Sequence, residues 1–263
     1  MKIGIGLPNV TPGTEGRRLV GWAQRAEELG FDSLGVIDRV VYDSYEPLLA
    51  LAMAAAVTER IELVTNVVIA PLRNTGMLAK QAASLDVLSG GRFVLGVGAG
   101  WLAAEMAAVG VDPAGRGERT DEYLDAMTAL WTDAAPEFHG RHVDFSEVDA
   151  HPRPSGIRVV VGGRSRAAHR RAVGRAHGFY GNGTPEEIAG DLDGLRRAAG
   201  EVDRPARLGT LEITAMPLEP IDAALAERYA ELGVDRLVLR PQAVDDPDEV
   251  ARYLERHTTL GGR

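Results

Sequence analysis

The stretch IELVTNVVIAPLRNTGMLAKQAASLDVLSGGRFVLGVGAGW, residues 61–101, decides how the rest of the chain is interpreted. It holds an apolar strand (61–67), a polar-tipped loop (71–74), a helix (75–88), a Gly-Gly turn and a second strand (93–97) that runs into a glycine-rich segment. A strand, a helix and another strand within about forty residues are typical of a βαβ unit in a parallel sheet. Small residues at the end of a strand let a flat ligand approach the backbone. We therefore expect a binding site where these two strands end.

The same alternation of strand and helix continues along the chain. Eight strands, each followed by a helix, are expected at 2–7, 33–37, 61–67, 93–97, 157–161, 178–180, 208–214 and 235–239. Thr184-Pro185-Glu186-Glu187 is a capping box that begins one helix, and a last helix is expected to begin at Asp246-Pro247. Residues 133–156 are rich in Pro, His, Asp and Gly and show no period, so we expect an excursion loop there, with a short hairpin at 142–145.

An internal echo supports a ring of such units. Glu-Leu-Gly-Phe-Asp-Ser-Leu at 28–34 matches Glu-Leu-Gly-Val-Asp-Arg-Leu at 231–237, so the same joint between helix and strand recurs. Eight strand–helix units closed on themselves form an α/β fold, the (β/α)8 TIM barrel, with its active site at the carboxyl ends of the strands. An open doubly wound sheet is the alternative, but no early strand–turn–helix carries a dinucleotide fingerprint. We predict one barrel domain over residues 1–263.

Composition excludes several classes of protein. The 263 residues are 45% hydrophobic and 25% charged, as in an ordinary globular protein, and the net charge of −9 argues against a nucleic-acid binder. No apolar run reaches the roughly 18–20 residues that a membrane helix needs, and the N-terminus enters a strand without a signal peptide. The absence of cysteine excludes disulfides and thiolate chemistry, and it suits the cytoplasmic location that we expect.

The run from Leu72 to Trp101, with Leu-Arg-Asn, Ala-Lys-Gln, Leu-Asp-x-Leu-Ser-Gly-Gly-Arg and Gly-x-Gly-x-Gly-Trp, resembles the bacterial luciferase-like monooxygenase family. The segments 3–9, 29–34 and 161–165 resemble it too, so the likeness covers essentially the whole chain. Within the family, the chain is most similar to the deazaflavin (coenzyme F-420)-dependent oxidoreductases. The resemblance implies a barrel, often a homodimer, that holds a flavin-type ring at its carboxyl end and acts on a small molecule. The cofactor would be F-420 or, as the alternative, FMN.

The resemblance implies that two of the strand ends form walls of the cofactor cavity. Thr65, Asn66 and Val67 close the third strand, where polar residues are poorly explained by packing. The resemblance implies a non-proline cis peptide bond at Asn66–Val67 that faces the central ring of the flavin. Gly98, Ala99 and Gly100 would form a second wall, with Trp101 as a lid or ring neighbour. The alternatives are a tight turn for the glycines and a core or rim position for Trp101.

A phosphate site is expected at Gly162, Gly163, Arg164 and Ser165, which precede a helix. Backbone N–H groups and the positive end of the helix dipole attract anions there, and Arg164 adds a charge. Plain N-capping by Ser165 is the alternative. Arg73 and Lys80 could extend this positive groove toward an anionic tail, or they could be solvated surface charges.

Asp38 and Arg39 end the second strand and carry the most informative departure from the family. Many members of the deazaflavin branch have a histidine at the position of Arg39, and that histidine is implicated in proton handling or substrate contact. Arginine stays protonated, so it cannot act as a general base near neutral pH. We expect Arg39 to act as an anion clamp, or the chemistry to need no base there. Asp38 would contact the ring edge of the deazaflavin or pair with Arg39. Glu105 is a candidate site acid, with a solvated helix face as the alternative.

No metal site is expected. His139, His142 and His151 lie in a loop that lacks a carboxylate scaffold or regular spacing. The predicted function is therefore hydride transfer between F-420 and a small organic substrate, with few protein acids and bases because the cofactor carries the chemistry. The alternatives are an FMN-dependent monooxygenase and a non-catalytic flavin-binding barrel.

Overall fold

The computed structural model describes residues 1–240 and 247–258, with the backbone alone for 247–251. The strands are β1 (Lys2–Gly6), β2 (Ser33–Val36), β3 (Glu62–Thr65), β4 (Val68–Ile69), β5 (Phe93–Gly98), β6 (Phe138–His139), β7 (Asp144–Phe145), β8 (Arg158–Gly162), β9 (Gly178–Asn182), β10 (Glu212–Met216) and β11 (Arg236–Leu239). The α-helices are α1 (Gly16–Glu28), α2 (Pro47–Ala55), α3 (Thr75–Leu88), α4 (Ala103–Ala108), α5 (Arg116–Thr132), α6 (Arg166–Arg175), α7 (Pro185–Ala199), α8 (Ala223–Glu231) and α9 (Pro247–His257). Short 3-10 helices lie at Ala70–Leu72 and Ala206–Leu208.

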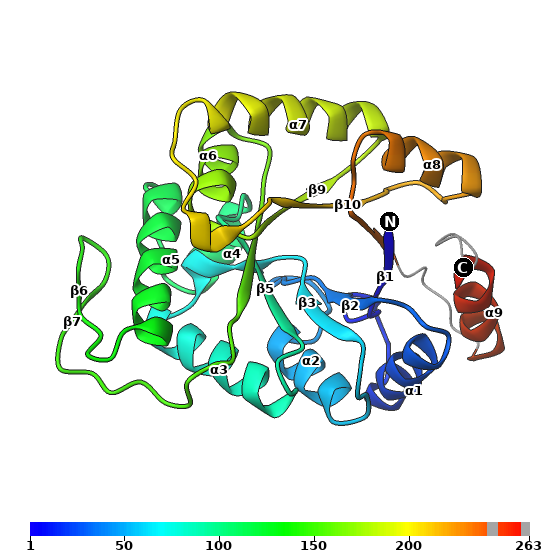
Figure 1. Ribbon diagram of the computed structural model, residues 1–263. Coiled ribbons are helices and arrows are strands. Elements are labelled where there is room, and N and C mark those ends of the chain that lie inside the picture. The colour runs from blue at the N-terminus through cyan, green and yellow to red at the C-terminus, as the bar shows by residue number, and fades with distance from the viewer. Residues whose placement is uncertain (241–246, 259–263) are drawn as a thin grey trace.

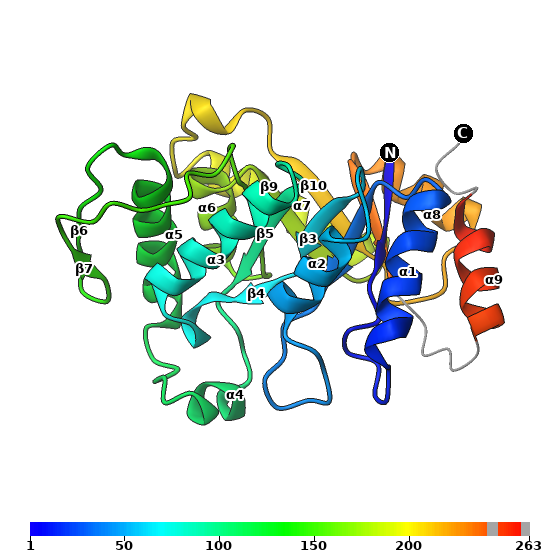
Figure 2. The same ribbon diagram turned by 90° about the horizontal axis from the view of Figure 1, so that it is seen from below.

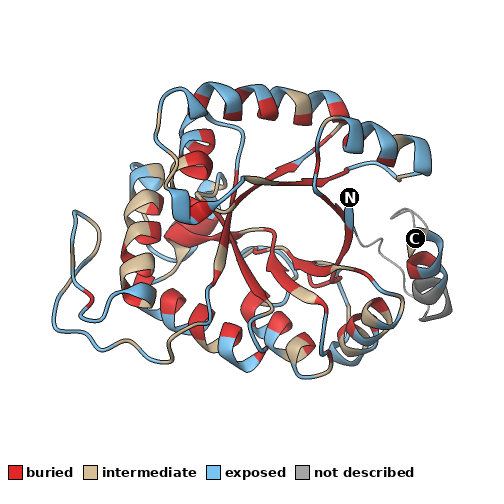
Figure 3. Ribbon diagram, in the orientation of Figure 1, coloured by how far each residue is buried: buried red, intermediate tan, exposed pale blue. Residues whose placement is uncertain are grey.

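The predicted (β/α)8 barrel is confirmed. Eight parallel strands follow one another in the order β3-β2-β1-β11-β10-β9-β8-β5, and β5 pairs back with β3 to close the ring (Figure 1). Helices surround this ring, and the buried faces of the helices and strands turn toward each other (Figure 3). None of the described helices has the length and apolar character needed to cross a membrane.

Apart from shifts of one or two residues, the strand boundaries differ from the sequence prediction in three places. The third predicted strand is divided, because β3 ends at Thr65 and a cis Asn66–Val67 peptide bond separates it from β4. The predicted strand at 208–214 begins only at Glu212, since the chain first forms a 3-10 turn and Gly209 has a φ of 58°. The hairpin of the excursion loop is longer than predicted, with β6 and β7 paired from Phe138 to Phe145 beside α5 (Figure 1). The last helix, α9, begins at Pro247 as predicted, and Asp246 lies outside the described residues.

The internal echo corresponds to one joint used twice. Gly30 and Gly233 have φ values of 82° and 87°, the left-handed conformation that glycine adopts without steric cost. The aspartate two residues later accepts a hydrogen bond from the neighbouring strand in both copies. Asp32 Oδ2 accepts from Ile3 N at 2.8 Å, and Asp235 Oδ2 accepts from Ile213 N at 2.7 Å. Each copy thus ends a helix and fixes the start of the next strand.

The interior of the barrel is apolar in the middle and charged at the amino ends of the strands. Side chains alternate along each strand, so Val64, Val94, Val160, Tyr180 and Met216 form a separate cluster inside the ring. The first residues of four strands close the amino end as a ring of ion pairs. Arg236, which is 3% exposed, bridges Glu62 at 2.5 Å and Glu212 at 3.0 Å. Arg158 bridges the same two carboxylates at 2.5 and 3.2 Å.

Replacing Arg236 by methionine is expected to lower the free energy of unfolding by about 3–5 kcal/mol, because it leaves two carboxylates short of a buried partner. Chemical denaturation measures the loss. Arg17→Ala is the control, since the Arg17–Glu15 pair is exposed and such pairs contribute less than about 1 kcal/mol. Equal losses in the two variants would contradict a stabilising role for the ring of ion pairs.

The same ring predicts a loss of stability in acid. Burial opposes the ionisation of Glu62, but Arg236 and Arg158 outweigh it and hold the pKa of this carboxyl below its ordinary value of 4.5. A depressed pKa stabilises the folded state fully above the unfolded-state pKa and loses that effect as pH falls through the folded-state pKa. The difference in unfolding free energy between wild type and Glu62→Gln should therefore be constant above about pH 5 and narrow below it. A difference in unfolding free energy that grew as the pH fell would contradict a lowered pKa for Glu62.

Candidate functional site

A cavity of about 650 Å3 opens at the carboxyl ends of the barrel strands, the face from which α4 and the loops after β1 and β2 project (Figure 2). Most of the predicted site residues line it: Asp38, Arg39, Asn66, Val67, Gly98, Ala99, Gly100, Trp101, Gly162, Gly163, Arg164 and Ser165. Thr65 and Glu105 do not. A cavity of about 840 Å3 at the amino end contains none of the predicted site residues.

The glycines of β5 and β8 make room for the protein's own chain. A Cβ added to Gly96 would lie 1.8 Å from the carbonyl oxygen of Thr65, and one added to Gly98 would lie 2.7 Å from Val67 Cγ2. A Cβ on Gly162 would also meet Val67, at 3.1 Å. These glycines therefore leave room for residues 65–67, which bulge against β5 between β3 and β4, and for the side chain of Val67. Val67, Gly98 and Gly162 line this part of the wall together.

Thr65 holds this bulge against β5. Its Oγ1 accepts a hydrogen bond from Gly96 N at 2.7 Å and donates one to Gly96 O at 2.8 Å, and its side chain has no solvent contact. The side chain is thus occupied by β5 and lies behind the cavity wall. The cis peptide bond expected at the next position, Asn66–Val67, is confirmed.

Asn66 is one of the buried polar groups that have no partner among the described residues, and both of its amide atoms are unpaired. Its side chain lines the cavity and is 7% exposed, and neither Oδ1 nor Nδ2 has a hydrogen-bond partner within the described part of the chain. A buried amide without partners is costly, and such groups usually mark the place of a ligand or an ordered water. The amide offers a donor and an acceptor side by side, which suits the edge of a heteroaromatic ring.

Asp38 pairs with Arg73, and not with Arg39 as one of our two expectations had it. Its Oδ1 lies 3.0 Å from Arg73 Nη2, and its Oδ2 accepts a hydrogen bond from Ile69 N at 2.9 Å. Burial raises the pKa of the Asp38 carboxyl above its ordinary value, against the opposing effect of Arg73. Arg73 also binds Glu46 at 2.6 Å, so its charge is used within the protein and does not extend a groove.

Arg39 lies between a buried carboxylate and two aromatic rings. Its Nε is 3.1 Å from Glu105 Oε1, and its guanidinium carbon lies 4.4 Å from the centroid of Tyr42 and 5.3 Å from that of Trp101. Nη2 is buried and has no hydrogen-bond partner among the described residues. Trp101 is 71% exposed, which makes it a rim residue. The stack places a permanent cation with a free donor at the cavity wall.

Glu105 is neither a solvated surface group nor a wall of the cavity. It is 1% exposed, and its Oε1 also accepts a hydrogen bond from Val40 N at 2.8 Å. The carboxylate therefore holds the loop after β2 against α4. Its effect on the site passes through Arg39.

The phosphate site predicted at Gly162–Ser165 has the expected backbone. Gly163 has a φ of 130°, and Ser165 Oγ accepts a hydrogen bond from Ala168 N at 3.1 Å at the start of α6. Arg164 leans away toward α7, where it pairs with Glu187 at 2.8 Å. The described backbone N–H groups and the helix dipole, more than a free arginine charge, are what this end of the cavity offers an anion.

A second helix begins at the same cavity and was not identified from the sequence. Gly115, Arg116 and Gly117, at the amino end of α5, line the wall near Gly163. Arg116 is exposed, contacts the carbonyl oxygen of Gly100 at 3.1 Å, and has no carboxylate partner among the described residues. The signal that could have revealed it is an arginine flanked by glycines directly before a helix.

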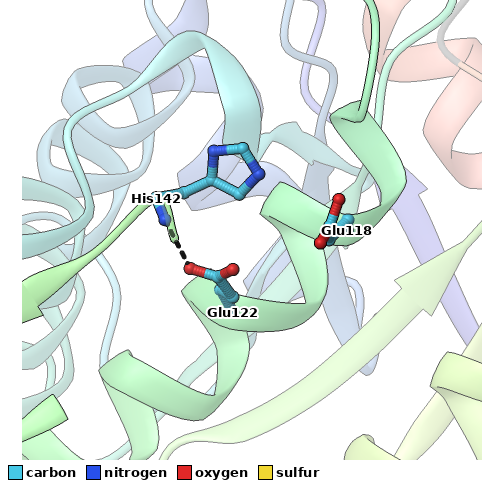
Figure 4. A group of neighbouring side chains, drawn as sticks. All are labelled: Glu118, Glu122 and His142. Atoms are coloured by element: carbon cyan, nitrogen blue, oxygen red, sulfur yellow. Dashed lines mark hydrogen bonds between the residues drawn. The ribbon is translucent and has the colours of Figure 1, made fainter. Parts of the chain in front are cut away.

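The three histidines of the excursion loop separate in space. His139 lies 2.7 Å from Asp144, and His151 lies 3.0 Å from Asp149, both on the surface. His142 instead approaches two carboxylates of α5, Glu118 and Glu122 (Figure 4). The carboxylates beside His142 thus come from α5 and not from the excursion loop, the segment considered from the sequence.

Known proteins resemble this chain over nearly its whole length. The family model described as luciferase-like monooxygenase matches residues 1–261. An uncharacterized protein of Mycobacterium tuberculosis (strain ATCC 25618 / H37Rv) is 36% identical over 219 residues, or 80% of this chain and 74% of the relative. The FMNH2-dependent dimethylsulfone monooxygenase of Pseudomonas putida is 28% identical over 185 residues, or 67% of this chain and 51% of that protein. A solved F420-dependent secondary alcohol dehydrogenase, in complex with an F420-acetone adduct, shares the fold with a TM-score of 0.82 and 17% identity over 97% of both chains.

The close approach of the Thr65 carbonyl to Gly96 predicts that position 96 does not tolerate a side chain. Gly96→Ala should lower the free energy of unfolding by about 1–3 kcal/mol or more, because the new methyl group would displace the Thr65 carbonyl. Gly190→Ala in α7 is the matched control. A Cβ there meets no atom within 4 Å, so that variant should gain about 0.5–1 kcal/mol. Chemical denaturation of both variants tests these predictions. A Gly96→Ala variant as stable as wild type would contradict the close contact between Gly96 and the Thr65 carbonyl.

Proposed function

Because this chain belongs to the luciferase-like monooxygenase family, we propose that it is a deazaflavin (F-420)-dependent oxidoreductase that transfers a hydride between the cofactor and a small organic substrate. The observation that carries the proposal is the Asn66 amide, buried at the cavity wall with both polar atoms unpaired. A ring edge that offers both an acceptor and a donor would satisfy it.

The residues present fit a flavin-type ring with an anionic tail. Asn66 and Val67 would hold one face of the ring, and the segment 98–101 would hold the other wall. The helix start at 162–165 would bind phosphate through its backbone N–H groups. A cavity of about 650 Å3 is within the usual range for ligand sites. When bound, the deazaflavin supplies the hydride chemistry.

Arg116 favours the deazaflavin over FMN in this proposal. Its uncompensated charge lies at the start of α5, beyond the helix start that would take a first phosphate. A cofactor whose tail carries further negative groups would use this charge, whereas a single phosphate would not need it.

Arg39 would act on the substrate as an electrostatic group. A hydride delivered to a carbonyl carbon leaves negative charge on the oxygen, and the free Nη2 donor of Arg39 can stabilise that charge. Trp101 and Tyr42 fix the guanidinium in place and cover it from water. Glu105 positions Arg39 from below, through the contact to Nε.

The second candidate function is an FMN-dependent monooxygenase. The relative from Pseudomonas putida, named for FMNH2, favours it. A flavin-binding barrel without catalysis is the third, and the arginine at position 39 motivates it. These candidates differ in cofactor or in turnover, and not in the fold.

We also propose a homodimer in the cytoplasm. Helices α2 and α3 pack side by side and expose large apolar side chains, with Leu49 72%, Met77 58% and Leu88 81% exposed. Such a surface suits a protein partner. Both statements remain predictions.

Fluorescence titration of the purified protein with F-420 and, separately, with FMN tests the cofactor assignment. We expect tight binding of F-420 and weak binding of FMN. Arg116→Gln should weaken F-420 binding by about tenfold and leave FMN binding nearly unchanged, because it removes one charge-assisted contact to the tail. Arg196→Gln, at an exposed pair on α7, is the matched control and should bind as wild type does.

The reverse cofactor preference would favour the monooxygenase. Binding of neither cofactor would contradict both enzyme hypotheses, and tight F-420 binding without turnover of any carbonyl or alcohol substrate would leave the non-catalytic barrel. An Arg116→Gln variant that lost FMN and F-420 equally would place the shared phosphate, and not the tail, at Arg116.

A further inference from the structure

Three potential metal ligands meet outside the cofactor cavity, between α5 and the β6–β7 hairpin. Glu118 and Glu122 are four residues apart, so they lie on one face of α5. His142 comes from the loop of the hairpin and lies against that face (Figure 4). One ligand atom from each side chain lies within 4.8 Å of the other two. Donor atoms this close can reach a common ion with bonds of about 2.0–2.2 Å after small side-chain rotations.

The His142 imidazole points to a missing partner. Its Nε2 is buried and has no hydrogen-bond partner among the described residues, although two carboxylates are near. A buried ring nitrogen is normally satisfied, and an imidazole beside two carboxylates is a common set for transition metals. The unpaired nitrogen is thus an observation independent of the acidic pair.

The two carboxylates also lack a full countercharge. Like charges four residues apart on a helix repel each other. Among the described residues, the cation beside them is Arg141, whose Nη1 lies 3.4 Å from Glu118 Oε2 and whose side chain is 74% exposed. Glu122 is held in place by the hairpin, because its oxygens accept from His142 N at 2.7 Å and from Arg141 N at 3.2 Å. The fold therefore orients Glu122 and leaves Glu118 free to move toward an ion.

We propose that Glu118, Glu122 and His142 bind one divalent first-row transition-metal ion. An imidazole nitrogen with two carboxylate oxygens suits Zn2+ and its neighbours, whereas Mg2+ and Ca2+ prefer oxygen ligands alone. Three protein ligands leave positions for water, since Glu118 is on the surface. The ion would fasten the hairpin to α5 and would be structural. This site is separate from the proposed oxidoreductase chemistry and does not depend on it.

Isothermal titration of chelator-treated, full-length protein with ZnCl2 tests the proposal, with the shift of the melting temperature as a second readout. We expect one saturable Zn2+ per chain, a rise in melting temperature, and no response to MgCl2 at the same concentration. Glu118→Gln and His142→Gln should each weaken Zn2+ binding at least tenfold. Neither change removes a residue of the barrel core, and unfolding of the metal-free variants verifies that they fold.

Two further variants separate this site from adventitious binding. Arg141→Gln should tighten Zn2+ binding, because the guanidinium competes with the ion for Glu118. His139→Gln, on the same hairpin but paired with Asp144, is the matched control and should bind Zn2+ as wild type does. Wild-type Zn2+ affinity in His142→Gln, or an equal loss in His139→Gln, would overturn the proposal, as would the absence of saturable binding to the wild-type chain.

Discussion

The candidate site depends on one steric constraint, the packing of residues 65–67 against glycines of β5 and β8. Gly96 leaves space for the Thr65 carbonyl, and Gly98 and Gly162 together leave space for the side chain of Val67. The hydroxyl of Thr65 then fastens this bulge to both backbone polar groups of Gly96. Asn66, at the centre of the bulge, lies in the cavity wall with its amide unpaired. An alanine in this part of β5 would change the wall itself, and not merely narrow the space for a ligand.

Most of the arginine side chains around the cavity are already paired with carboxylates of the protein. Arginine side chains line or approach the cavity, but Arg73 is held by Asp38 and Glu46, and Arg171 is held by Asp121 at 2.7 Å. Arg164 is likewise paired with Glu187. Counting cations in the sequence therefore overstates the positive field that an anionic ligand would meet. What remains is local, since the starts of α5 and α6 point at the same space and Arg116 has no described carboxylate partner.

The barrel and the location of its cavity could be predicted from the sequence because they follow from local patterns. Strand and helix periods, the repeated Gly-x-Asp joint and the glycines at the end of β5 lie within short windows of the chain. The pairings within the site could not be predicted, because they join distant segments. Asp38 finds Arg73 thirty-five positions later, and Glu105 becomes buried only when α4 folds under the loop after β2. The approach of Glu118 to His142 needs the hairpin to pack beside α5, which no period in residues 133–156 indicates.

The residues around the cavity also limit the proton transfers that the protein itself can carry out. Arg39 is a cation held between the Glu105 carboxylate and the rings of Tyr42 and Trp101. Asp38 is the described carboxylate on the cavity wall, and both of its oxygens already accept from donors, Arg73 and Ile69 N. Burial raises the pKa of the Tyr180 phenol, whose hydroxyl donates a hydrogen bond to Met216 Sδ. A guanidinium and a buried phenol are poor proton carriers near neutral pH, and the Asp38 carboxylate is already engaged by two donors. The described wall is thus built to orient and to stabilise charge, and a reaction in this cavity would take its proton from solvent or from the substrate.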